Sequence, residues 1–173
     1  MGRAQKQKYM RKEKIQKLSC GEIEIAVANY FNPRIHLIVP NISYGMNLYE
    51  CDLLVMNGRN YGVEVEIKIS KADLKKDALK KHGHVSNKLR RLFFAIPEYL
   101  FTDEVVAMIP ERAGILVISI RKKEGTHIFN PKCYMKRAAK INKFARPFSQ
   151  GERVEMGRLG MLRYWNIRNN YNK

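Results

Sequence analysis

Residues 49–69 carry the pattern that most limits how this chain can fold, because two strand-like segments flank a turn at 57–60. In the second segment, apolar residues alternate with small or charged ones. The small or charged residues are Gly62, Glu64, Glu66 and Lys68. Side chains point alternately to the two faces of a strand, so the pattern predicts a β-hairpin with one apolar face and one charged face.

The register of this hairpin decides whether Asp52 belongs to the charged face. A two-residue turn at Asn57-Gly58 would set Asp52 opposite Val63, on the apolar face. A three-residue loop at 58–60 would instead set Asp52 opposite Glu66. Opposed side chains lie about 4.5–5.5 Å apart at Cβ, so the two carboxylates would then hold a single cation. We predict the three-residue loop, or a bulge with the same effect.

Asp52 and Glu66 are hard oxygen donors of the kind that bind Mg²⁺ or Mn²⁺, and the backbone carbonyl of Ile67 is a third candidate ligand. Lys68 lies roughly 6.6 Å along the strand from Glu66 on the same face. From there its ammonium would orient a water and offset phosphate charge. The alternative is a solvated outer sheet face with an incidental Glu66–Lys68 pair.

The spacing of Asp52 and Glu66-Ile67-Lys68 resembles the PD-(D/E)XK, or restriction-endonuclease-like, nuclease superfamily. Over roughly residues 20–120 the chain is similar to small bacterial and phage members akin to MmcB-like DNA-repair proteins. One departure is Cys51, which stands where many members have proline. The segments that carry the resemblance are 50–54, 64–77, 93–98 and 113–118.

This resemblance implies an α/β fold with a central mixed β-sheet flanked by helices. It also implies a metal-dependent phosphodiesterase in which Asp52, Glu66 and Lys68 are catalytic, together with a glutamate on the first helix. That helix is predicted over 19–31. Glu22 lies nearer its amino end, where the helix dipole favours an acid, so we assign capping to Glu22 and the functional role to Glu24.

Apolar periodicity and capping residues predict the remaining elements. In the helix over 19–31, the inward side chains should be Ile23, Val27 and Tyr30. A second helix is predicted to begin at Ser70. Its inward side chains should be Leu74, Ala78 and Leu79, and Asp77 should lie on its outer surface. Strands are predicted at 34–39, 92–96 and 115–120, with a short helix or turn at 98–108. A docked helix is predicted over 152–168, with one face formed by Val154, Met161, Leu162 and Trp165.

The net charge of +17 lies entirely in the two ends of the chain. Residues 1–17 carry a net +6, residues 121–173 a net +11, and residues 18–120 are neutral. The charge distribution predicts a basic N-terminal arm over 1–17 and a basic, helical extension over 131–173. The resemblance implies a nuclease-like core over 18–130 between them. Because basic surfaces gain affinity from phosphates, the expected partner is DNA. Solubilising tails, or arms that bind RNA or acidic protein, are the alternative.

Basic side chains that follow the hairpin are candidates for the nucleic-acid path: Lys71, Lys75, Lys80, His84, Lys88 and Arg90. His82 and His84 at the end of the second helix are a weak metal signal, since the helix dipole explains them equally well. Tyr164 and Trp165 would stack on bases or, as we favour, pack as part of a helix face.

Three widely spaced cysteines without a Cys-x-x-Cys indicate a reducing interior. Together with the resemblance, this implies the cytoplasm of a bacterial or phage-infected cell. No apolar run approaches the about 20 residues that span a bilayer. We therefore expect a Mg²⁺- or Mn²⁺-dependent DNA endonuclease. The alternatives are a non-catalytic nucleic-acid-binding module with the same fold, or an RNase. Two-fold substrates would favour a homodimer, but no residue indicates one.

Overall fold

The computed structural model describes residues 17–42, 46–80, 82–122 and 129–171. Its elements follow the order α1 (Cys20–Phe31), β1 (Leu37–Ile42), β2 (Cys51–Met56), β3 (Gly62–Ile67), α2 (Lys71–Asp77) and β4 (Leu89–Pro97). They continue with the short 3₁₀ helix η1 (Glu98–Leu100), α3 (Asp103–Met108), β5 (Gly114–Lys122), β6 (Phe129–Arg137) and α4 (Gln150–Tyr171). Of the predicted basic arm, only Lys17 lies within the described residues.

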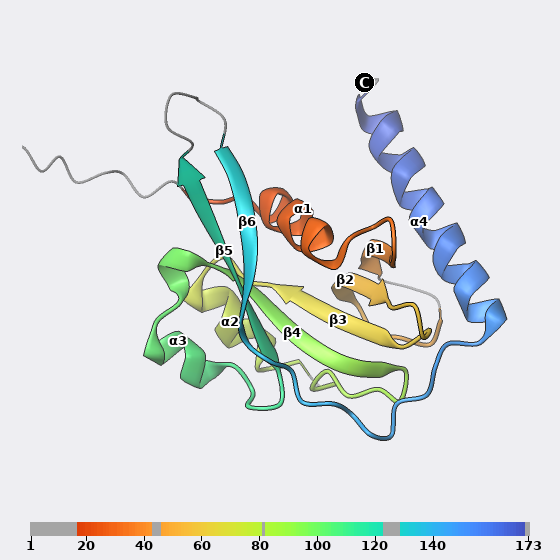
Figure 1. The fold of residues 1–173 in the computed structure, drawn as a ribbon, viewed down its shortest axis with the longest axis horizontal. Coiled ribbons are helices and arrows are strands. Elements are labelled where there is room, and N and C mark those ends of the chain that lie inside the picture. The colour runs from red at the N-terminus through yellow and green to blue at the C-terminus, as the bar shows by residue number, and fades with distance from the viewer. Residues whose placement is uncertain (1–16, 43–45, 81, 123–128, 172–173) are drawn as a thin grey trace, which may run out of the picture.

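A six-stranded mixed sheet in the order β1-β2-β3-β4-β5-β6 forms the centre of the molecule (Figure 1). The first three strands are antiparallel neighbours, β3, β4 and β5 run parallel, and β6 is antiparallel to β5. This arrangement confirms the predicted α/β class with helices around a central mixed sheet. The almost continuous apolar runs predicted as central strands are β4 and β5.

The hairpin between β2 and β3 has the predicted three-residue loop. The Asn57 N–H donates to the Tyr61 carbonyl at 3.1 Å, and Asn60 has a left-handed φ of 62°. The paired residues run from Met56 opposite Gly62 to Leu53 opposite Val65. One further step in this register sets Asp52 across from Glu66, as predicted.

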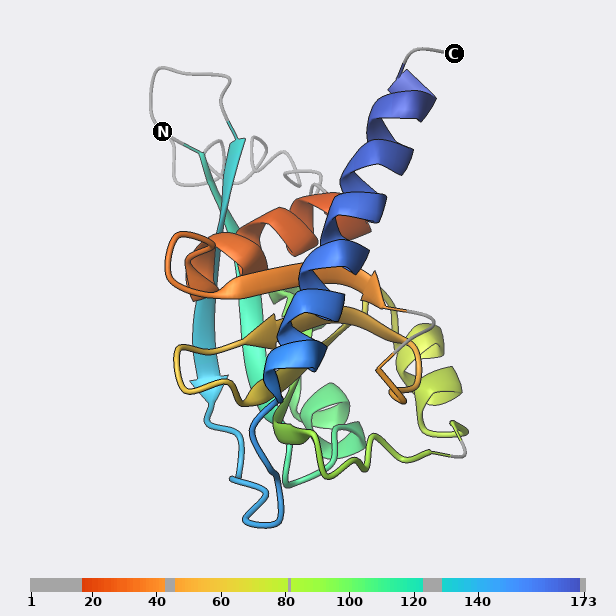
Figure 2. The same cartoon turned by 90° about the vertical axis from the view of Figure 1, so that its right-hand side faces the viewer.

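The two faces of the sheet bury separate cores. Helix α1 packs on one face, where Ile23 and Val27 contact strand residues such as Val65. Leu74 of α2 and Val105 of α3 contribute to the core on the other face. A third cluster, around Met156 of α4 and Val39 of β1, lies at the β1 edge, where α4 crosses the sheet (Figure 2).

Several helical side chains predicted to be buried are exposed. Tyr30 is 41% exposed, and Phe31 packs on the sheet core in its place. Leu79 is 81% exposed and Ala78 is also exposed, because α2 ends at Asp77 and the chain turns away. Asp77, predicted on the outer surface, is buried.

The first strand and the C-terminal region also differ from the prediction. Strand β1 begins three residues later than predicted and runs through Pro40, which an edge strand tolerates. Residues 129–137 form the edge strand β6, so the region after 131 is not wholly helical and the sheet extends beyond the predicted core.

Helix α4 docks through a different face from the one predicted. Met156 is fully buried and Leu159 packs beside it, while Val154, Met161, Leu162 and Trp165 are all between 46% and 69% exposed. Gly160 explains the choice of face, since a Cβ at that position would lie 3.2 Å from the Val39 side chain. The rings of Tyr164 and Trp165 contact one another, and both side chains remain about half exposed, so neither is buried as the favoured interpretation required.

Candidate active site

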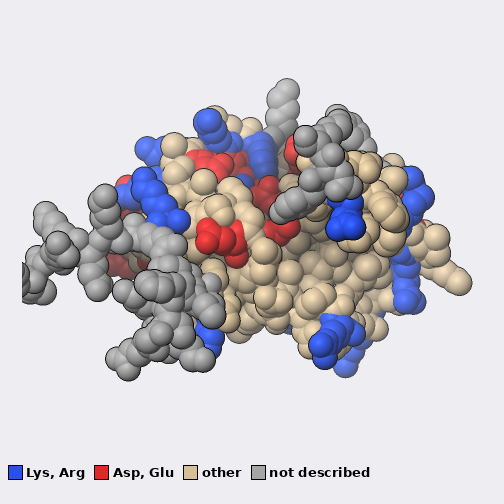
Figure 3. Space-filling model, turned by 90° about the horizontal axis from the view of Figure 1, so that it is seen from above, with Lys and Arg blue, Asp and Glu red and all other residues tan. Residues whose placement is uncertain are grey.

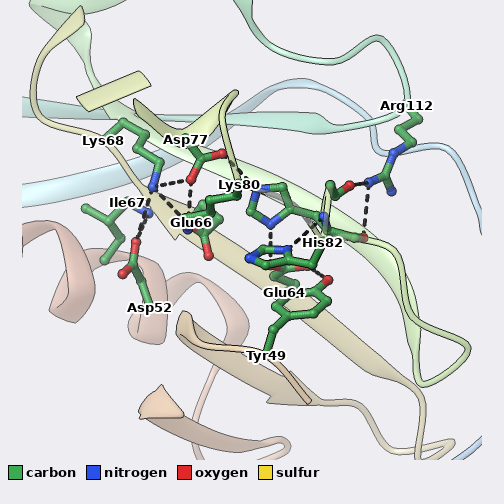
Figure 4. A network of polar contacts seen from close by, with 12 residues as sticks. Tyr49, Asp52, Glu64, Glu66, Ile67, Lys68, Asp77, Lys80, His82 and Arg112 are labelled. Atoms are coloured by element: carbon green, nitrogen blue, oxygen red, sulfur yellow. Dashed lines mark hydrogen bonds and ion pairs between the residues drawn. The ribbon is translucent and has the colours of Figure 1, made fainter. Parts of the chain in front are cut away.

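Asp52, Glu66 and Lys68 converge where β2 begins and β3 ends. Oδ2 of Asp52 accepts a 2.7 Å hydrogen bond from the Ile67 N–H. The Lys68 ammonium lies 2.7 Å from Oε2 of Glu66 and 3.8 Å from Oδ2 of Asp52. The three side chains predicted from the hairpin pattern therefore form one cluster (Figure 4).

Burial differs sharply between the two carboxylates of this cluster. The Glu66 side chain is fully buried, whereas that of Asp52 is 37% exposed. Burial raises the pKa of Glu66 to about 7, with the nearby Asp52 charge also raising it and Lys68 acting against both. The arrangement gives one solvent-facing carboxylate beside one that is protected from solvent.

Asp77 of α2 is a member of the site that the sequence did not reveal. Its Oδ1 lies 2.9 Å from the Lys68 ammonium and 2.8 Å from that of Lys80. Burial alone would raise the pKa of Asp77, but hydrogen bonds from His84, Lys80 and Lys68 outweigh it and hold the pKa well below its usual range. Asp77 therefore remains ionised and, together with Glu66, fixes the ammonium of Lys68.

Glu64 and His84 extend this network along the same sheet face. His84 Nδ1 lies 2.7 Å from Oε1 of Glu64, and its Nε2 lies 2.7 Å from Oδ2 of Asp77. Burial would lower the pKa of His84, yet the two carboxylates outweigh this effect and raise it to about 9. The charged imidazolium then donates to both acids. The hydroxyl of Tyr49 donates to the other Glu64 oxygen at 2.7 Å.

The network has one negative charge in excess when every group is ionised. Its acids are Asp52, Glu64, Glu66 and Asp77, and its cations are Lys68, Lys80 and His84. Oε1 of Glu66 is buried and has no hydrogen-bond partner among the described residues. A buried carboxylate oxygen without a partner is costly, and an added cation beside it would remove that cost.

These donors fit a hard divalent cation. Asp52 and Glu66 supply carboxylate oxygens, and such oxygens are the preferred ligands of Mg²⁺ and Mn²⁺. Ligand atoms of Glu64, Glu66 and His84 also lie within 4.8 Å of one another. Each ring nitrogen of His84 already lies 2.7 Å from a carboxylate, however. The pair on β2 and β3 is therefore the better candidate.

Of the two glutamates of α1, Glu22 has the capping role that was predicted for it. Glu22 forms a capping box with Ser19, in which the carboxylate accepts from the Ser19 backbone N–H at 2.8 Å. Glu24 is half-buried, and burial followed by the charge of Asp52 raises its pKa. Glu24 thus lies within electrostatic reach of the cluster but outside its hydrogen-bonded network.

Of the six side chains predicted to line a nucleic-acid path, Lys80, His84 and Lys88 are held by acidic side chains, and two of these three, His84 and Lys88, are buried. Lys80 pairs with Glu66 and Asp77, His84 is buried between two acids, and Lys88 is buried against Glu152. Lys71 is exposed and pairs with Glu104 of α3, while Lys75 is exposed on α2. Arg90 is half-buried and lies over the Tyr61 ring at 4.0 Å.

Comparisons with known proteins support the fold alone. No family model and no curated protein matches the sequence. The chain is similar in structure to the SPO1766 protein of unknown function from Silicibacter pomeroyi, with a TM-score of 0.60 and 16% identity over 91% of this chain and 94% of that chain. Among the described residues, no helix combines the length and apolar character needed to cross a membrane.

Proposed function

We propose that the protein is a divalent-metal-dependent DNA endonuclease with its active site at Asp52, Glu66 and Lys68. The observation that carries this proposal is the convergence of two carboxylates and one ammonium from neighbouring strands, beside a buried carboxylate oxygen that has no described partner. The basic chain ends support a polyanionic substrate, since the +17 net charge would draw phosphates to the molecule.

Asp52 and Glu66 would hold Mg²⁺ or Mn²⁺, with the Ile67 carbonyl as a third oxygen. When bound, such an ion lowers the pKa of a coordinated water and offsets charge on the phosphate. The Ile67 N–H fixes the Asp52 carboxylate, and the Glu66 carboxylate is fixed by its burial and by two ammonium groups. Both acids are therefore oriented before any substrate arrives.

Lys68 would orient the attacking water and stabilise the charge that builds up on the scissile phosphate. Its position depends on Asp77, which holds the ammonium at 2.9 Å, and Asp77 is in turn held by His84. Asp77 and His84 are therefore positioning residues, while Glu24 would assist through an ordered water. Figure 4 shows Lys68 between Asp52, Glu66 and Asp77.

A non-catalytic nucleic-acid-binding module is the second candidate, and one observation favours it. Oε2 of Glu66 accepts from both Lys68 and Lys80 at 2.7 Å, so much of its charge is already neutralised within the chain. Both candidates predict salt-sensitive binding. Only the endonuclease requires that Mn²⁺ bind at Asp52.

The test is cleavage of linear, nicked, flapped and four-way DNA, and of matched RNA, with Mg²⁺, Mn²⁺ or EDTA. We expect cleavage that EDTA abolishes and that is lost in Asp52→Asn and Lys68→Ala proteins purified in the same way. Cleavage confined to RNA would make the protein an RNase. Absence of cleavage on every substrate, together with no Mn²⁺ binding by calorimetry, would leave the binding module.

A further inference from the structure

A concave surface lined by cations runs from the β2–β3 loop to His84, whose buried ring contacts the network carboxylates of Glu64 and Asp77. Two adjoining cavities of about 240 and 430 Å³ form it, and they share Arg90, Arg91 and Ile141. We call this surface the basic groove. Its cationic lining comprises Arg59, Arg90, Arg91, Arg112 and Lys140.

The described lining of the basic groove contains no acidic side chain. This is a marked separation of charge, because residues 18–120 have no net charge. Most of the groove cations belong to that neutral part of the chain. In Figure 3, the face seen from above shows acidic side chains near its middle and Lys and Arg groups mainly toward its edges. The described lining of the groove is basic although most of it comes from a part of the chain that has no net charge.

The groove cations differ in how firmly they are held. Arg112 donates to the Gly83 carbonyl at 2.6 Å and to the His84 carbonyl at 3.1 Å, and Lys140 pairs with Glu111. Arg59 and Arg91 are exposed and have no ionic or hydrogen-bond partner for their side chains among the described residues. The guanidinium groups of Arg59 and Arg91 are therefore available to bind a ligand, whereas the side chains of Arg112 and Lys140 are already oriented by their partners.

We propose that the basic groove binds the phosphate backbone of a nucleic acid. Guanidinium groups match phosphate oxygens in geometry and charge, and Tyr61 and Ile141 supply apolar surface for sugars and bases between them. An extended row of cations suits an extended polyanion better than a single phosphate does. This inference deepens the proposed function, on which it rests for the identity of the polymer.

The groove and the candidate active site lie at opposite ends of β3. The β2–β3 loop precedes Gly62, whereas Glu66 lies near the far end of the strand. The groove lining reaches Val63, and the three residue steps from Val63 to Glu66 span roughly 10 Å, which corresponds to about three base pairs at 3.4 Å each. A nucleic acid held in the groove would therefore be anchored a few nucleotides from the bond that is cut.

The test measures binding without cleavage. Fluorescent single-stranded and duplex 20-nucleotide DNAs are titrated in EDTA, with the full-length protein, between about 50 and 200 mM salt. The groove variant is Arg59→Gln/Arg91→Gln. The matched control is Arg34→Gln/Lys132→Gln, which removes two exposed cations outside the groove and changes the net charge equally.

We expect the groove variant to bind at least about tenfold more weakly, with the slope of log K against log salt reduced by about two. The control should keep most of the affinity and slope. Equal behaviour of the two variants would overturn the proposal, as would tighter binding of poly-glutamate than of DNA by the wild-type protein. Far-UV circular dichroism of each variant establishes that it is folded.

Cleavage by the same proteins separates this inference from the proposed function. If the wild-type protein cleaves no substrate but the groove variant loses nucleic-acid binding, the groove proposal is upheld and the endonuclease proposal is rejected. A groove variant that binds and cleaves like the wild-type protein would reject the groove alone.

Discussion

The ammonium of Lys68 lies 2.7 Å from Oε2 of Glu66, and both side chains are almost completely buried. Replacing Lys68 with alanine would leave buried carboxylates without one of their cations. We expect Lys68→Ala to lower the free energy of unfolding by about 3–5 kcal/mol, as measured by urea denaturation. Lys71→Ala is the matched control, because its exposed pair with Glu104 adds little stability. Equal stability of the two variants would contradict this account of the cluster.

Asp52 is the solvent-facing acid of the candidate site, so its charge should be needed for metal-dependent cleavage. We expect Asp52→Asn to lower the cleavage rate by about 10³-fold, because metal assistance contributes several kcal/mol to such reactions. Mn²⁺ affinity measured by calorimetry should fall in parallel. Glu50→Gln, an exposed acid two residues away, should leave both unchanged.

His84 should make stability depend on pH. The pKa of His84 is raised to about 9 in the folded protein by Asp77 and Glu64 acting against burial, whereas an unfolded histidine has a value near 6.5. The stabilisation is therefore fully present below about pH 6.5 and is lost as pH rises through about 9. It is on the order of 3 kcal/mol.

Urea denaturation between pH 6 and pH 10 tests this dependence. The wild-type protein should lose stability over the upper part of that range, and His84→Gln should flatten the decline. His82→Gln serves as the control, because His82 stacks on Tyr49 instead of bridging the two carboxylates. If stability declines with pH in His84→Gln as it does in the wild-type protein, another titrating group causes the decline.

Helix α4 should be anchored by its first half. Met156 is fully buried against β1, so Met156→Ala should cost about 2–5 kcal/mol of stability. Met161 is 55% exposed one and a half turns later, and Met161→Ala should change stability little. Thermal unfolding of both variants provides the comparison, and similar losses would indicate that the second half of α4 also docks.

The hairpin and its acids were predictable because their information is local. The loop at 57–60 fixes the register, and the strand period of two then places Asp52, Glu66 and Lys68 on one face. Asp77 was not predictable in the same way. Its burial depends on where α2 ends and on a turn that returns His84 to the sheet, and both are set by tertiary packing.

In the C-terminal region, too, the local sequence pattern was not enough to predict the structure. Strand β6 contains Pro131 and several charged residues, so its sequence lacks the apolar run of a central strand, and pairing with β5 determines its structure. In α4 the apolar residues are spread around the helix. Close approach at Gly160 then selects the docking face, which periodicity alone could not identify.

Both outermost strands of the sheet contain a proline, Pro40 in β1 and Pro131 in β6. Proline has no N–H to donate, and edge strands accommodate it with its nitrogen turned away from the ladder. Neither margin therefore presents an unbroken series of backbone donors to an incoming polypeptide. Each proline interrupts the margin at which another strand would be added, which disfavours β-augmentation there.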